Sequence, residues 1–97
     1  MNTLLRTSEF DDWLRNLRNT KARARVIARI DSAIYNNFGD CKALGGGMSE
    51  MRIDLGPGYR VYFARWGETK YVLLMGGDKS TQSADIRCAR EILREWH

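Results

Sequence analysis

Two stretches in the first half of the chain repeat their apolar residues with the period of an α-helix. The first follows Ser8, an expected N-cap because acidic residues fill the turn after it. The second runs from about 21 to 37 and should end at Gly39. Because only Asn19-Thr20 separates them, we expect an antiparallel helical hairpin. The apolar rows are Phe10, Trp13, Leu14 and Leu17, then Ala22, Val26, Ile30, Ile34 and Phe38.

The second half of the chain changes to the patterns of β-strands. Residues 50–55 and 59–66 alternate apolar and polar side chains, and the Gly56-Pro57-Gly58 turn joins them. A third run, 69–75, follows a tight turn at Gly67-Glu68. This run is continuously apolar from 71 onward, which indicates a central strand covered on both faces.

The remaining segments complete the expected fold. Residues 1–7 could form a short strand, residues 40–47 read as a loop, and residues 81–96 form a last helix. Helices and strands segregated in this way predict one α+β domain over 1–97 with two layers. In this arrangement an N-terminal helical hairpin packs on an antiparallel sheet, and a helix follows at the C-terminus. The apolar stripe of the last helix is Ile86, Ala89, Leu93 and Trp96.

Charge narrows the choice of partners. The formal net charge is +4, and twelve of the sixteen basic residues are arginine. Arginine favours planar, bidentate contacts with phosphate or carboxylate groups. A small basic domain is therefore expected to bind nucleic acid or an acidic protein segment.

Several classes of protein are disfavoured by the composition. No run approaches the 18 or more apolar residues of a membrane span, and residues 1–10 lack a signal-peptide pattern, so we expect a cytoplasmic protein. Cys41 and Cys88 are far apart, and His97 is the only histidine. We therefore expect two reduced thiols and no metal site or cofactor.

A basic row lies on the second predicted helix. Lys21, Arg25 and Arg29 follow one another at spacings of four, and Asp31 is the only acidic residue in that helix. Like charges at this spacing destabilise a helix by about 0.2–0.5 kcal/mol per pair. Toleration of that cost favours an anionic partner such as ribosomal RNA, although the row could equally be a merely solvated face.

Three segments resemble the addiction module killer protein branch of the RelE/HigB-like toxins. They read MSEMRI at 48–53, GPGYRVYF at 56–63 and GGDKSTQ at 76–82. The helical segments containing Arg23-Ala24-Arg25 and Arg29-Ile30-Asp31 are also similar to that branch. The resemblance covers nearly the whole chain and agrees with the element order derived above.

The resemblance implies a toxin of a type II toxin–antitoxin system with a RelE-like fold. Its expected activity is metal-independent cleavage of messenger RNA on the ribosome, and its expected partner is a cognate antitoxin in a hetero-oligomer. ParE-like relatives on the same fold instead inhibit DNA gyrase, so the fold leaves that alternative open. A plain nucleic-acid-binding module without toxicity is a third possibility.

RNA cleavage by attack of the 2′-hydroxyl needs a base, an acid and positive charge beside the phosphorane. Arg52 and Arg60 lie on strands joined by the 56–58 turn, about 4.8 Å apart, and Lys79 follows the next strand. These three cations could converge on one sheet face. By resemblance, Arg60 stabilises the transition state, Lys79 protonates the leaving group or binds phosphate, and Arg52 matches a phosphate contact more loosely.

The general base is not evident from the sequence. Relatives use lysine, histidine, tyrosine or aspartate, and this chain has no interior histidine. Asp78, Tyr62 and Tyr59 are candidates, with Tyr62 on the same strand face as Arg60. Ordinary structural roles compete with these roles. Arg52 could pair with Glu50 or Asp54 on its own face, and Arg60 and Lys79 could be solvated or paired.

Overall fold

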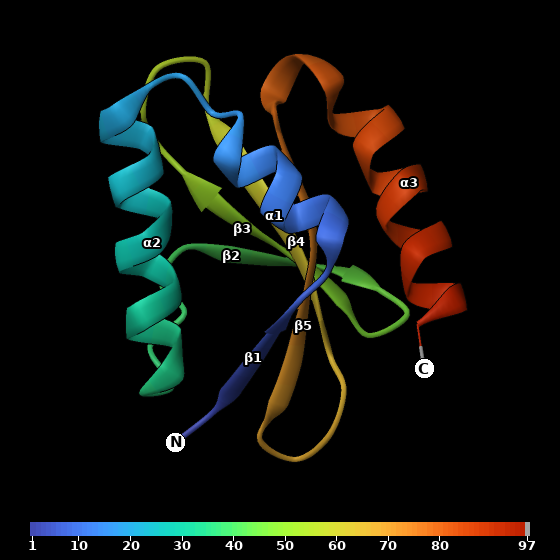
Figure 1. The fold of residues 1–97 in the computed structure, drawn as a ribbon. Helices are drawn as coiled ribbons and strands as arrows, with labels where there is room; N and C mark the ends of the chain where they lie inside the picture. The colour runs from blue at the N-terminus through green and yellow to red at the C-terminus, as the bar shows by residue number, and fades with distance from the viewer. Residues whose placement is uncertain (97) are drawn as a thin grey trace.

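The computed structural model describes residues 1–96 and has an α+β fold. A five-stranded mixed sheet has the order β1-β5-β4-β3-β2 (Figure 1). Only the β1–β5 pair is parallel. The strands are β1 Thr3–Arg6, β2 Cys41–Gly45, β3 Met48–Ile53, β4 Tyr59–Arg65 and β5 Lys70–Asp78. The helices are α1 Ser8–Arg15, α2 Thr20–Ile34 and α3 Gln82–Glu95, and a 3₁₀ turn, η1 Lys79–Thr81, precedes α3.

The strand at β2 corrects the expectation of a loop over 40–47. Residues 41–45 pair antiparallel with β3, and the register shifts between Ala43 and Gly45. This strand lies at the edge of the sheet, where three of its five residues are exposed and none is buried. An exposed edge strand needs no regular apolar alternation. The local sequence therefore carries no strand signal, and pairing with β3 decides the conformation.

Helices cover both faces of the sheet, so the expected two layers are three. Strand β4 lies between two hydrophobic cores, and its side chains alternate between them. Val61 and Phe63 face α1 and α2, whereas Tyr62 and Ala64 face α3. The first core also contains Phe10, Leu14, Leu17, Ala22, Val26, Ile30, Ala33, Met51, Ile53 and Leu73. The second contains Met48, Val72, Leu74 and Ala89. The strand predicted to be covered on both faces, β5, indeed contributes to both cores.

The N-terminal helices match the expected hairpin only in part. Both pack on one face of the sheet, but α2 diverges from α1 (Figure 1). The cap of α1 is Thr7 and not Ser8, because the buried Thr7 hydroxyl accepts from the Phe10 amide at 3.0 Å and donates to the Leu74 carbonyl at 2.6 Å. Helix α2 ends at Ile34, before the expected stop at Gly39. None of the helices within residues 1–96 is long and apolar enough to span a bilayer.

Two glycines at the end of β5 let helices approach both faces of the strand. A Cβ at Gly76 would lie 2.4 Å from the Trp13 ring of α1, and a Cβ at Gly77 would lie 1.9 Å from Asp85 Oδ2 of α3. Both distances are far below van der Waals contact. Gly77 therefore lets the first turn of α3 pack directly on the end of β5, next to Lys79.

Candidate functional site

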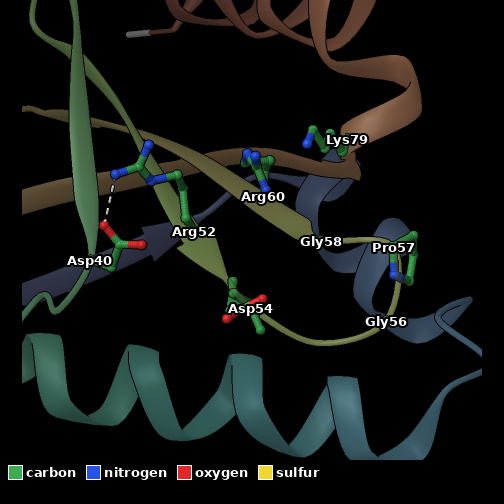
Figure 2. Close-up of a pocket in the computed structure, with 9 residues that line it drawn as sticks. Asp40, Arg52, Asp54, Gly56, Pro57, Gly58, Arg60 and Lys79 are labelled. Carbon is green, nitrogen blue, oxygen red and sulfur yellow. Dashed lines mark hydrogen bonds and ion pairs between the residues drawn. The ribbon is translucent and has the colours of Figure 1, made fainter.

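An open cleft of about 310 Å³ lies where β3, β4 and η1 meet, at the 56–58 turn. Figure 2 shows Arg52, Arg60 and Lys79 along one side of it, in that order. The structure thus brings the three predicted cations together. The other residues lining the cleft are Asp40, Ile53, Asp54, Gly56, Pro57 and Gly58.

Backbone pairing positions these cations. Arg52 and Arg60 are direct partners in the β3–β4 ladder. The Lys79 amide donates to the Gly58 carbonyl at 2.8 Å, which ties η1 to the turn between those strands. Two arginines facing each other across a ladder repel, so each requires a compensating anion nearby.

Arg60 is compensated by a buried carboxylate. Its Nε lies 3.1 Å from Glu50 Oε2, and Glu50 is only 1% exposed. The contact is an ion pair and not a hydrogen bond, because Nε–H lacks a partner in hydrogen-bonding geometry within residues 1–96. Gln82, at the start of α3, donates through Nε2 to both Glu50 oxygens at 3.0 and 3.3 Å. Gln82 of α3 therefore holds the Glu50 carboxylate of β3, which in turn holds the Arg60 guanidinium, and the Arg60 side chain is 13% exposed.

Glu50 and Gln82 were missed by the sequence reasoning. A signal existed, because Glu50 and Arg52 share a strand face and the hairpin register places Glu50 diagonally across from Arg60. The sequence pattern instead offered Glu50 as a partner of Arg52. Gln82 could not be assigned this role, because it lies 32 residues from Glu50 on an element whose docking the sequence does not specify.

Arg52 pairs with Asp40, and not with Glu50 or Asp54. Its Nη2 lies 2.9 Å from Asp40 Oδ1, and both side chains are substantially exposed. The hydrogen bond and charge of Arg52 lower the pKa of Asp40, and the same contact raises the pKa of Arg52. A solvated pair of this kind is weak and open to competition. An incoming anion could therefore displace Asp40 from Arg52.

None of the three candidate bases is among the residues that line the cleft. Tyr62 is fully buried, its hydroxyl has no hydrogen-bond partner within residues 1–96, and burial together with the charge of Glu50 raises its pKa to about 12. Asp78 caps η1 by accepting from the Ser80 amide at 2.8 Å, and the Ser80 hydrogen bonds lower its pKa. Tyr59 packs against the core on the α1–α2 side. The carboxylates that do line the cleft are Asp40 and Asp54.

The basic row on α2 divides into two kinds of residue. Lys21 and Arg25 are exposed, as a binding face requires. Arg29 is half-buried and donates to three backbone carbonyls, those of Arg52, Phe38 and Asp40, at 2.7, 2.9 and 3.1 Å. Arg29 therefore fastens α2 to the strand and loop that carry the Arg52–Asp40 pair.

The cleft as a whole can accept an anion. Arg60 lines the cleft with a side chain that is 13% exposed, Lys79 is exposed with no ion pair within residues 1–96, and Arg52 has an exchangeable partner. Among residues 1–96 no cluster of histidine, cysteine or acidic side chains could hold a metal ion. Charge-assisted hydrogen bonds from these three side chains suit a phosphate group.

Comparison with known proteins places the chain in a family. Residues 12–96 match the family model described as "Phage derived protein Gp49-like (DUF891)". The chain is also 46% identical over 89 residues to a Haemophilus influenzae protein named only as uncharacterized, covering 92% of this chain and 90% of that protein. The protein therefore belongs to the Gp49-like family, which is associated with the toxins of toxin–antitoxin pairs.

Proposed function

We propose that this protein is a RelE/HigB-like toxin that cleaves messenger RNA on the ribosome, with the scissile phosphate bound in the cleft. The observation that carries the proposal is Arg60, a guanidinium fixed by buried Glu50 and facing a cleft that Arg52 and Lys79 also line. Fixed positive charge is what a phosphorane requires, since a preorganised donor costs no reorganisation during the reaction.

The reaction needs no group beyond the RNA and the protein side chains. The ribose 2′-oxygen attacks phosphorus, the bond from phosphorus to the 5′-oxygen breaks, and the products are a 2′,3′-cyclic phosphate and a 5′-hydroxyl. Arg60 binds the non-bridging oxygens, Arg52 joins it after exchanging Asp40 for phosphate, and Lys79 gives a proton to the leaving oxygen. Asp54 is the cleft carboxylate without an ion pair within residues 1–96, and we assign it the proton from the 2′-hydroxyl.

The surrounding charges support contact with RNA beyond the cleft. Lys21 and Arg25 are free of ion pairs within residues 1–96 and exposed on α2, so we assign them contacts to ribosomal RNA phosphates. Arg29 is not assigned such a contact, because its guanidinium is used by three carbonyls. The toxin acts in the cytoplasm and is neutralised by an antitoxin in a hetero-oligomer.

The test is RNA cleavage in a translating extract. Wild-type protein should cut messenger RNA, and Arg60→Ala should reduce the rate at least about 100-fold, the usual cost of removing one transition-state donor. Arg87→Ala is the matched control, because Arg87 is exposed on α3 outside the cleft. Intact transcript with wild-type protein would refute the nuclease proposal. If DNA supercoiling by gyrase is then inhibited, the ParE-like alternative is correct.

A further inference from the structure

Another concavity, of about 410 Å³, lies between the first turn of α1 and the C-terminal half of α3. It shares no lining residue with the cleft. Figure 1 shows this end of α3 beside the start of α1. We call this concavity the α1–α3 groove. It is lined by Thr7, Ser8, Glu9, Cys88, Glu91, Ile92, Glu95 and Trp96.

The groove combines apolar side chains with acidic ones. Ile92 and Trp96 belong to the apolar cluster under α3 and are still partly exposed. Glu9, Glu91 and Glu95 are exposed beside them, and among residues 1–96 no lysine or arginine lines the groove. Glu91 pairs with Arg94, whereas the other two glutamates form no ion pair within residues 1–96.

This charge is opposite to that of the cleft and of the protein as a whole, whose net charge is +4. Negative side chains around the groove repel RNA phosphates, so the groove does not suit nucleic acid. They attract a positively charged peptide segment, and the apolar side chains can receive an apolar anchor from it. A cavity of about 410 Å³ is as large as small-molecule pockets, so it has room for an anchoring side chain.

We propose that the α1–α3 groove docks the neutralising partner protein, through a segment with basic side chains on either side of an apolar anchor. The inference rests on the proposed function, which supplies the partner. It adds the surface that the partner uses and the chemistry of the partner's contacting segment. Because the groove and the cleft are separate, the segment in the groove leaves Arg60 uncovered.

Cys88 provides a built-in reporter of occupancy. Its side chain is exposed on the wall of the groove, whereas Cys41 is half-buried and burial raises the pKa of its thiol. Thiolate is the reactive form, so N-ethylmaleimide should label Cys88 first. A segment seated in the groove should protect Cys88.

The experiment uses the toxin alone and in complex with the protein product of the neighbouring reading frame. Mass spectrometry follows N-ethylmaleimide labelling, and Cys88 should react at least about tenfold more slowly in the complex. Glu9→Lys and Glu95→Lys should each weaken the complex at least about tenfold, because like charges then face each other. Both variants should keep wild-type RNA cleavage. Glu68→Lys, with the same charge change on the β4–β5 turn, should bind as wild type.

Each outcome decides a different point. Full protection of Cys88 with weakened binding by both groove variants supports the proposal. If the complex is stable but Cys88 stays unprotected, or if neither variant weakens the complex, the partner does not dock in the groove, and the proposed function is unaffected. If no complex forms, both the predicted partner and its docking in the groove are refuted. RNA cleavage by the wild type would still support the nuclease proposal.

Discussion

Replacing Glu50 by glutamine tests whether a buried ion pair holds Arg60. The substitution keeps the shape of the side chain and removes the charge that lies 3.1 Å from Arg60 Nε. Breaking a buried pair by removing one partner costs about 3–5 kcal/mol, because the other charge is left uncompensated. Arg60 keeps 13% exposure through the cleft, which lets water share the charge, so about 2–3 kcal/mol is expected here.

The assay is thermal unfolding followed by circular dichroism. A loss of 2–3 kcal/mol lowers Tm by roughly 10–20 °C in a domain of this size. The double variant Glu50→Gln, Arg60→Met should recover much of the lost stability, because no unpaired charge remains buried. Its combined effect should therefore be smaller than the sum of the single effects by about 1–3 kcal/mol.

The same substitution tests the link between stability and activity. Glu50→Gln should also slow RNA cleavage, since a misplaced Arg60 loses its fixed geometry, whereas the double variant should stay inactive although it is stable. A change in Tm below about 2 °C for Glu50→Gln, with additive effects in the double variant, would refute the ion-pair reasoning. This test of the ion pair uses unfolding alone, so its outcome does not depend on whether the protein cleaves RNA.

Three further predictions concern the cleft and its supports. Asp40→Asn should strengthen phosphate binding, because it frees Arg52 from its ion pair. In the wild type, Arg52 lowers the pKa of Asp40, so the contribution of Asp40 to stability is present above the ordinary pKa of 3.8. This contribution is lost as pH falls through the lower pKa of the folded state, and NMR titration of the carboxyl group measures that pKa. Gly77→Ala should destabilise the fold by about 1–3 kcal/mol in urea unfolding, because a Cβ there would lie 1.9 Å from Asp85 Oδ2. Tyr62→Phe should be neutral or stabilising, since it removes an unpaired buried hydroxyl. In the wild type, the raised pKa of Tyr62 makes stability fall as pH rises from 10.0 towards about 12.

Each of these predictions has a result that contradicts it. Unchanged phosphate affinity in Asp40→Asn would mean that Arg52 does not bind the anion. If Gly77→Ala were as stable as the wild type, α3 would be able to move away from β5 at little cost. Gly67→Ala is the matched control, because the nearest atom to a Cβ there would be 3.6 Å away. A Tyr62→Phe variant that unfolds more easily would reveal a hydrogen bond of this hydroxyl.

The sequence by itself predicted the elements whose burial is strong and regular. The helical rows around Leu14 and Val26, the alternating strand around Val61 and the continuous apolar run of β5 all correspond to elements of the structure. Local periodicity determines which face of an element is buried, and short turns determine which strands are neighbours. For this reason the hairpin at Gly56-Pro57-Gly58 was sufficient to predict that Arg52 and Arg60 lie side by side.

The tertiary structure alone decided what covers each face and which charges meet. The pairing of β2, the position of α3 on the face opposite α1 and α2, and the contacts of Arg29 all join segments that are distant in sequence. The same is true of Gln82 on Glu50. A period shows that a face is buried but not against which partner, and a charged residue on a strand can pair with any neighbour that the fold brings near. The convergence of cations could therefore be predicted from the sequence, whereas the carboxylates that hold them appeared only once the helices were packed on the sheet.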